Sequence, residues 1–325
     1  MSLRAAVLGL GHLGRHHARI LGDLSGVELT AVCDTDPSRF DQPEIPRGPL
    51  RTQDPEEACA RADLVVVAAP TRVHVPLARA ALLAGRHVLV EKPLAPSADE
   101  ARSLLEAARH SGATLLCGHT ERFNGAYRAL EGRLSGPRFV EGHRLAGFTA
   151  RSLDVDVVMD LMVHDLDLLL RCVKRPVARV EAAGIPVVTP KVDIASARIT
   201  FEGGCVANLT ASRISERPVR KLRFFDRDSY WSLDFKAQEA VVARLGRGED
   251  GLPRPSQDVI TLPGEPLRLE LEDFVQTCRA RAGGRAAAPA GATGEEALEA
   301  LELGQRVERA IEEHRASHSG APERP

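Results

Sequence analysis

Two kinds of hydrophobic pattern alternate through the first third of the chain. Short runs of apolar, often β-branched residues are followed by longer segments in which apolar residues recur every three or four positions. The first pattern predicts buried strands, and the second predicts helices packed against them. Strands are predicted over residues 4–10, 27–33, 62–68, 87–90 and 114–117, and helices over residues 12–24, 54–60, 73–84 and 97–110. This alternation is typical of an α/β domain with a doubly wound parallel sheet, whose ligands bind outside the carboxyl ends of the strands.

The pattern changes after residue 120. A predicted helix over residues 125–134 and an extended segment over 139–147 precede an apolar helix over 154–173. Strand-like runs then follow over residues 177–188, 194–201, 205–214, 222–225 and 231–235. Because no helices separate these runs, we expect an antiparallel sheet. A loop rich in Gly, Pro and Asp is predicted over residues 247–263, with helices over 267–281 and 294–314.

The first predicted strand runs directly into the sequence GLGHLG, a helix follows, and the next strand ends at Asp34. This is the context of the dinucleotide-binding fingerprint, in which glycines let the backbone approach a pyrophosphate at the positive end of a helix. The residues expected to line the cofactor in this turn are Gly9, Gly11, His12, Leu13 and Gly14. A carboxylate at Asp34 suits a ribose hydroxyl and repels a 2′-phosphate, so NAD is predicted over NADP.

The chain is therefore predicted to have two domains and a tail. Residues 1–120 form a Rossmann dinucleotide-binding domain, and residues 121–315 form an α+β domain on an open antiparallel sheet. The C-terminal helix is expected to pack either on the second domain or back on the first. Residues 316–325 are expected to be a disordered tail.

Charge and composition narrow the classes of partner. The chain has 43 basic and 45 acidic residues, a net charge of −2 and a pI near 6.6, which gives no reason to expect a nucleic acid or membrane partner. No apolar run reaches membrane-spanning length. The six cysteines are widely spaced and lie mostly in apolar runs, which is typical of buried thiols in a cytoplasmic protein.

Polar residues follow three of the predicted parallel strands at their carboxyl ends. We expect their side chains to converge on the cofactor crevice, because these strand ends meet at one edge of the sheet. The candidates for cofactor binding there are Pro70, Thr71, His74, Glu91, Lys92 and Arg122.

The helix predicted over residues 154–173 is apolar almost all round, and its polar residues are not scattered. Asp156, Asp160, His164 and Asp167 share one stripe at helical spacing, whereas Asp165 points elsewhere. A carboxylate and an imidazole four residues apart are close enough to interact. From this helix alone the pair is either structural, satisfied by nearby backbone, or part of a pocket. The histidines lack compact ligand spacing, so no metal site is predicted.

These motifs together resemble the family named after glucose-fructose oxidoreductase, inositol dehydrogenase and a rhizopine-catabolism protein (Gfo/Idh/MocA). GLGHLG, AAPTRVH, HVLVEKPLA, GHTERFN and DLMVHDLD occur in the family's order across nearly the whole chain. The resemblance implies nicotinamide-dependent oxidation or reduction of a sugar or cyclitol hydroxyl. It also implies that the open sheet makes a homodimer or homotetramer.

The family's catalytic residues fall on Lys92, Asp160 and His164. His164 has the acid–base properties of a general base, Asp160 would orient its ring, and Lys92 would hydrogen-bond the reacting oxygen. Which of Lys92 and His164 takes the proton stays open. A non-catalytic nicotinamide sensor, the alternative of another class, would be expected to lack one of these groups.

The alternative within the family is an inositol or free-sugar dehydrogenase. Two departures from the family pattern remove no catalytic group, but the first weakens the analogy to inositol dehydrogenases. Met162 stands where many relatives have glycine, and Gly125 where many have proline. Other segments are more similar to a subgroup that oxidises nucleotide sugars such as UDP-N-acetylglucosamine at C3. A diphosphate substrate would need cations or amides, and the candidates are Arg122, Asn124, Arg144, Arg151 and Arg213.

Overall fold

The computed structural model describes residues 2–149, 155–247, 253–285 and 288–318. The chain forms two compact units, each built from two separate segments. The first unit contains residues 1–123 and 265–298, and the second contains residues 124–264 and 299–325. The chain therefore leaves the first unit after Phe123, close to the predicted boundary, returns to it at Glu265 and leaves it again after Leu298.

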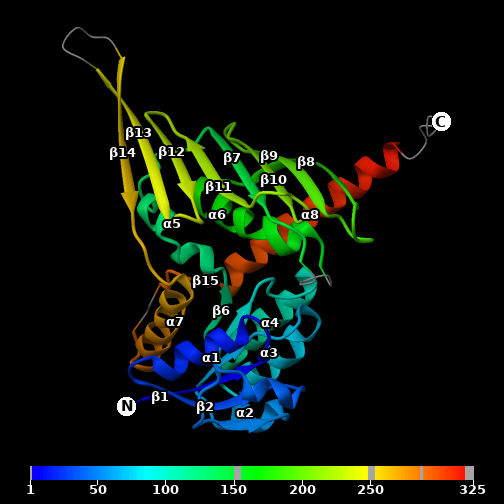
Figure 1. Cartoon of the computed structure of the whole chain (residues 1–325), viewed down its shortest axis with the longest axis vertical. Coiled ribbons are helices and arrows are strands. Elements are labelled where there is room, and N and C mark those ends of the chain that lie inside the picture. Colours follow the sequence, from blue (N-terminus) through cyan, green and yellow to red (C-terminus); the bar gives the residue numbers. More distant parts are fainter. Residues whose placement is uncertain (1, 150–154, 248–252, 286–287, 319–325) are drawn as a thin grey trace. The chain divides into compact units, whose positions relative to one another are not determined.

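The first unit is the predicted Rossmann-type domain. In the described residues its sheet has the order β15-β6-β5-β4-β1-β2-β3 (Figure 1), and only the short β15 runs antiparallel to its neighbour. The strands are β1 Leu3–Leu8, β2 Val27–Cys33, β3 Leu50–Thr52, β4 Leu64–Val67, β5 His87–Glu91, β6 Leu115–Gly118 and β15 Ala292–Thr293. The order places β1 between β4 and β2, so the crevice at the carboxyl end of β1 is where a dinucleotide binds in this fold.

Helices flank this sheet, and local signals fix their ends. Ser97 caps the helix that follows β5 by accepting a hydrogen bond from the Glu100 amide, and Gly112 ends that helix at a φ of 70°. The helices are α1 Gly14–Asp23, α2 Pro55–Ala60, α3 His74–Leu83, α4 Ala98–Ser111 and α7 Pro266–Ala282, with the short turns η1 Pro37–Asp41, η2 Thr71–Val73 and η3 Thr120–Phe123.

Helix α7 belongs to the core of the first unit although it lies far along the chain. Its Leu271, Phe274 and Val275 are buried together with Ile20 and Leu21 of α1. Figure 1 shows α7 beside α1. Burial of such side chains contributes about 1.5–3 kcal/mol each, so this late segment is essential to the stability of the unit.

The second unit is an open sheet with helices on one face (Figure 1). In the described residues the sheet order is β14-β13-β12-β11-β7-β10-β9-β8. The strands are β7 Phe139–Leu145, β8 Val177–Ile185, β9 Ile194–Phe201, β10 Val206–Ser212, β11 Val219–Phe225, β12 Ser229–Asp234, β13 Glu239–Arg247 and β14 Pro253–Thr261. The predicted antiparallel pairing is correct except for β7 and β10, which run parallel because the chain passes through a helix and two other strands between them.

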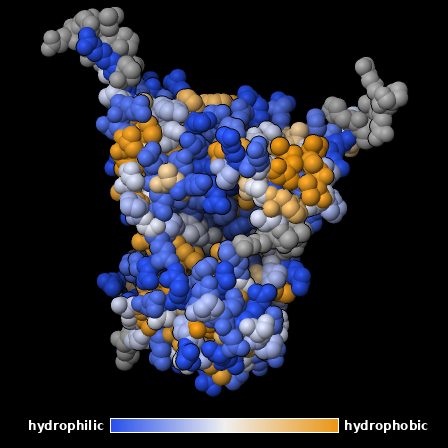
Figure 2. Space-filling view, in the orientation of Figure 1, coloured by the Kyte–Doolittle hydropathy of each residue, from blue (hydrophilic) through white to orange (hydrophobic). Residues whose placement is uncertain are grey.

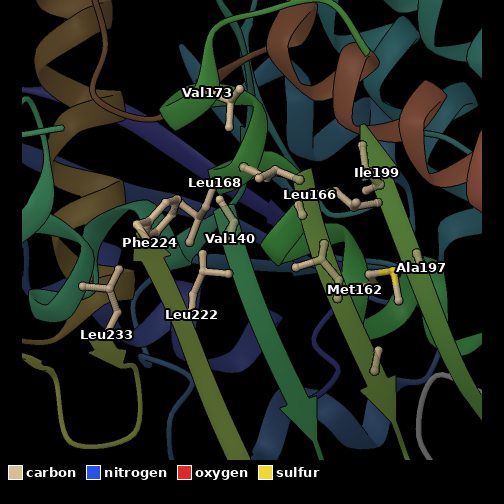
Figure 3. Close-up of a cluster of buried hydrophobic side chains, with 14 of the residues drawn as sticks. Val140, Met162, Leu166, Leu168, Val173, Ala197, Ile199, Leu222, Phe224 and Leu233 are labelled. Carbon is tan, nitrogen blue, oxygen red and sulfur yellow. The ribbon is translucent and has the colours of Figure 1, made fainter. Parts of the chain in front are cut away.

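The helical layer of this unit contains α5 Gly125–Leu130, a π-helical turn η4 at Val158–Met162, α6 Val163–Val173 and the long α8 Gly294–His318, which begins in the first unit. Alternate residues of the central strands face this layer and form one hydrophobic core. Figure 3 shows Met162 within that core, with Ala197 and Leu222 of the sheet. The methionine that replaces a glycine of many relatives is thus a packing residue.

Three predicted elements differ from the structure. The region expected to be a loop over residues 247–263 contains β14, and its prolines are tolerated because β14 is an edge strand. The helix expected over residues 154–173 begins as a π turn. Residues 316–318 of the expected tail are helical, and residues 319–325 lie outside the described part of the chain.

Figure 2 shows mostly hydrophilic residues on the visible surface, with hydrophobic ones in separate patches. Among the described residues, no helix has the length and apolarity needed to cross a membrane. The six cysteines are all free thiols, as predicted.

Candidate active site

The glycine turn between β1 and α1 is built so that only one of its glycines faces open space. Gly9 has a φ of 91°, and a Cβ there would lie 2.7 Å from the Ala69 amide nitrogen. A Cβ on Gly14 would lie 1.8 Å from the Gly9 carbonyl oxygen. A Cβ on Gly11 would meet nothing within 4 Å. The turn is therefore closed by Gly9 and Gly14, and Gly11 leaves room for a pyrophosphate in front of the N-terminus of α1.

Asp34 lies where the second strand ends and holds the same turn. One carboxylate oxygen accepts a 2.6 Å hydrogen bond from the Leu10 amide, and the other accepts one of 2.9 Å from the Asp36 amide. The Nε of Arg39 lies 3.9 Å from the second oxygen. Asp34 thus couples the glycine turn to the expected ribose position. His12 and Leu13 in the turn are exposed, and His12 Nδ1 lies 3.3 Å from a guanidinium nitrogen of Arg15.

His74 fastens together two of the loops at the sheet edge. It is 1% exposed, its Nε2 lies 2.7 Å from the carbonyl oxygen of Ala69, and its Nδ1 lies 2.9 Å from that of Pro93. Carbonyl oxygens only accept, so both hydrogen bonds form only when both ring nitrogens carry a proton. The ring thus connects the Pro70–Thr71 loop to the turn that follows Lys92.

Lys92 directly follows β5, and its half-buried side chain is preceded by the buried Glu91. A Glu91 oxygen lies 2.7 Å from Nε2 of His17 in α1, and the other accepts the Lys92 amide at 3.3 Å. Burial alone would raise the pKa of Glu91, but His17, Lys92 and His74 outweigh it and hold that pKa below its usual value. The carboxylate beside Lys92 is therefore ionised.

A second buried carboxyl group lies in the same unit. Glu270 of α7 is 2% exposed and accepts a 3.2 Å hydrogen bond from the Thr120 hydroxyl. Burial, together with the charge of Glu91, raises the pKa of Glu270 well above its usual value. Arg122, a predicted cofactor and substrate residue, is 4% exposed and has a nitrogen 2.7 Å from a Glu296 oxygen.

The second unit carries the predicted carboxylate–imidazole pair at the junction of the π turn and α6. Asp156 caps the turn by accepting hydrogen bonds from the Val158 and Met159 amides at 2.8 and 3.1 Å. Asp160 and His164 are both half-buried, whereas Asp167 is 2% exposed. The two residues thus lie neither in the core nor fully exposed to solvent. π turns inside helices are frequent at functional sites.

Two of the candidate diphosphate residues make internal ion pairs in this unit. Arg144 donates to both oxygens of the buried Asp165, the closest contact being 2.7 Å. Arg213 is 4% exposed, its Nε lies 3.3 Å from Asp193, and it donates to the carbonyl oxygens of Val155 and Val192. These contacts give both arginines a structural role.

Two further candidates for diphosphate binding are Asn124 and Arg151. Asn124 caps α5 through its side-chain oxygen and donates its amide to the carbonyl oxygen of Phe235 at 2.9 Å. Arg151 lies outside the described residues.

Sequence reasoning missed His17 and Glu270. His17 follows Gly14 by three residues on the buried face of α1, a position where the pattern predicts only packing. Glu270 stands in the predicted helix over 267–281 as one acidic residue among several, and nothing in its spacing marks it as buried. Among the described residues no group of three or more ligand-type side chains is arranged to hold a metal ion.

The first unit has open space at Gly11 of the glycine turn and a carboxylate at the end of the second strand. These features are typical of an NAD-binding domain of an oxidoreductase. Residues 3–119 match the family model described as "Oxidoreductase family, NAD-binding Rossmann fold", and residues 122–225 match "GFO/IDH/MocA C-terminal domain". The chain belongs to the Gfo/Idh/MocA family of NAD-binding oxidoreductases, as its motifs predicted.

Individual relatives agree with this assignment. The chain is 36% identical over 281 residues to the UDP-N-acetylglucosamine 3-dehydrogenase of Acidithiobacillus ferrooxidans, covering 86% of this chain and 89% of that protein. A solved structure of that enzyme superimposes with a TM-score of 0.86 at 33% identity, covering 96% and 98% of the two chains. The scyllo-inositol 2-dehydrogenase of Bacillus subtilis is 27% identical over 232 residues, 66% of this chain and 68% of that protein.

Proposed function

We propose that this protein oxidises the C3 hydroxyl of the sugar in UDP-N-acetylglucosamine, with NAD as the hydride acceptor. The observation that carries the proposal is the 36% identity to a dehydrogenase of that name across 86% of the chain. Similarity to the scyllo-inositol enzyme is lower and covers less of the chain. The placement of Met162 in the core adds a local difference from relatives with glycine at this position.

The chemistry follows from the properties of three side chains. NAD, when bound, takes the hydride from the alcohol carbon, and this transfer requires loss of the hydroxyl proton. His164 has a suitable unperturbed pKa to receive that proton, and Asp160 one turn earlier would orient the ring. Lys92 would donate a hydrogen bond to the reacting oxygen and stabilise its developing negative charge.

The supporting residues of the first unit prepare the cofactor site. In this proposal the pyrophosphate lies at Gly11, where a Cβ would meet nothing, and Asp34 would contact the adenosine ribose, while His74 contacts two loops of the same edge. We further propose that the enzyme acts in the cytoplasm as a homodimer or homotetramer through the open sheet of the second unit. The free thiols of the six cysteines are consistent with a reducing compartment.

The substrate is tested by incubating the protein with NAD and a panel of UDP-sugars, inositols and free sugars while NADH absorbance is followed. We expect NADH with UDP-N-acetylglucosamine and a 3-keto sugar nucleotide as product, accumulating when the ketone is trapped. If inositol or a free sugar gives NADH and UDP-sugars do not, the nucleotide-sugar proposal is wrong and only the family assignment stands.

The catalytic roles are tested by Lys92→Met and His164→Ala. Each is expected to lower turnover about a hundredfold or more while NAD binding is retained, which is the usual effect of losing a general base or a preorganised donor. Asp160→Asn should also be slow. The matched controls are Lys236→Met and His143→Ala, which remove the same charge or ring elsewhere. Near-normal turnover of either catalytic variant would show that its role is wrong.

A further inference from the structure

The buried contact between His17 and Glu91 in the first unit has no assigned role. The His17 side chain is 0% exposed and the Glu91 side chain is 8% exposed, with 2.7 Å between Nε2 and Oε1. His17 belongs to the helix that starts at the glycine turn, and Glu91 immediately precedes Lys92. The contact therefore links the cofactor-binding helix to the residue beside the proposed catalytic lysine.

The chemistry of His17 argues that the bond to Glu91 is its purpose. In the described part of the chain its Nδ1 is buried and has no hydrogen-bond partner. An apolar side chain would fill this position without burying a bare ring nitrogen, which costs free energy. Hence the imidazole contributes through Nε2 alone, as a donor to a buried carboxylate.

Glu91 transmits this contact to Lys92. Its second oxygen accepts the Lys92 amide at 3.3 Å, and a Cβ on Gly118 of the neighbouring strand would lie only 3.0 Å from that oxygen. The carboxylate is thus held on one side by His17 and confined on the other by β6. A carboxylate fixed in this way holds the backbone amide of Lys92, and its negative charge interacts favourably with the positive charge of that lysine.

We propose that His17 is a positioning residue, which orients Lys92 by holding the Glu91 carboxylate in place. The inference rests on the proposed function, because it assumes that Lys92 contacts the reacting oxygen. His17 itself touches neither substrate nor cofactor in this scheme.

The charged groups around Glu91 determine what happens when His17 is removed. His17 from α1, His74 from α3 and Lys92 favour its ionised form, while burial and the nearby Glu270 of α7 oppose it. Without His17, the pKa of Glu91 rises because burial is less opposed. The carboxyl group then takes up a proton at a higher pH than in the parent protein, and its fixed negative charge is lost.

The test compares His17→Leu with His17→Gln, whose amide donates a hydrogen bond over a similar reach. In His17→Leu, turnover should fall about ten- to a hundredfold, the effect of losing one hydrogen bond to a charged group, with little change in the KM for NAD. A new acidic limb should appear in its pH–rate profile. His17→Gln should restore most of the turnover, and its profile should lack the acidic limb. The turnover of Glu91→Gln should be low, and its profile should also lack the acidic limb.

A second measurement does not depend on the substrate. Reductive ¹³C-methylation labels the five lysines of the chain, and Lys92→Arg identifies the Lys92 NMR signal. In His17→Leu this signal should shift with pH as Glu91 titrates, whereas in the parent protein and His17→Gln it should stay constant over the same range. If the parent oxidises no sugar, the proposed function fails and this signal still tests the positioning role.

Two results would overturn the inference. One is a His17→Leu protein with the pH profile and Lys92 signal of the parent. The other is an equal loss in His17→Gln and His17→Leu, which would indicate packing. Ile20→Val is the packing control, because Ile20 is a buried apolar residue of the same helix. It should lower stability without changing the profile. If His17→Leu does not fold, normal turnover in Glu91→Gln refutes the inference.

Discussion

Replacement of Gly11 by alanine separates cofactor binding from folding, because this glycine faces open space in the protein alone. A Cβ there meets nothing within 4 Å, so Gly11→Ala should change the free energy of unfolding by less than about 0.5 kcal/mol. The same Cβ occupies the space through which a pyrophosphate approaches the start of α1. Forcing an extra methyl into such a contact costs about 1–3 kcal/mol, so the Kd for NAD should rise about ten- to a hundredfold.

Gly14→Ala provides the contrast, because its Cβ would lie 1.8 Å from a backbone oxygen of Gly9. The clash is internal, so this variant should lose about 3 kcal/mol of stability or more, before any cofactor is added. Gly48→Ala is the matched control, since its Cβ also meets nothing within 4 Å and it lies outside the glycine turn. Kd values come from NADH fluorescence and stability from denaturant unfolding. The reasoning is refuted if Gly11→Ala binds NAD as the parent does, or if it is as unstable as Gly14→Ala.

Three further outcomes are expected. The parent should bind NAD with a lower Kd than NADP. Asp34→Asn should reduce the difference between the two Kd values, and it keeps an acceptor for the Leu10 amide. Equal binding of both cofactors by the parent would contradict this. Arg213→Ala should lower the free energy of unfolding by about 3–5 kcal/mol in urea titrations, because it leaves the buried Asp193 without its ion pair. An unchanged stability with a raised KM for a UDP-sugar would instead favour a substrate role. Burial and the neighbouring Asp156 raise the pKa of Glu308 from 4.5 to about 8, so the native state keeps a proton that the unfolded state releases. Stability should therefore fall as pH rises between those values, by at most about 1.4 kcal/mol per unit, and Glu308→Gln should flatten this decline in thermal unfolding from pH 6 to 8.5.

The fold was predictable where local pattern and tertiary structure agree. The glycine turn, the parallel strands and the flanking helices of the first unit follow from short-range signals, since buried parallel strands are continuous apolar runs. The strand β14 was not predictable, because its prolines and polar residues form a strand only when paired along β13. The parallel pairing of β7 with β10 likewise depends on contacts distant in sequence.

The candidate residues of the site were chosen from motif and spacing, which say little about the contacts that their side chains make. Spacing alone brings Asp160 and His164 to one helix face. By contrast, the alternation that placed Arg213 at the end of a strand does not reveal whether its side chain meets solvent or the buried Asp193. The contact of His17 with Glu91 joins α1 to β5, and the contact of Glu270 with Thr120 joins α7 to η3; no local pattern reports either closure.

The path of the chain determines how this protein can be dissected for biochemical work. A fragment ending near residue 120 would lack α7 and expose the apolar surfaces of α1 that Leu271, Phe274 and Val275 cover, so we expect it to aggregate when expressed. An independently folding cofactor module requires a shortened gene in which Phe123 is joined to Glu265. The turn η3 packs against α7, so a short glycine–serine linker should suffice for this connection. Such a module would let nucleotide affinity be titrated in the absence of His164, the proposed catalytic histidine, and of the rest of the second unit.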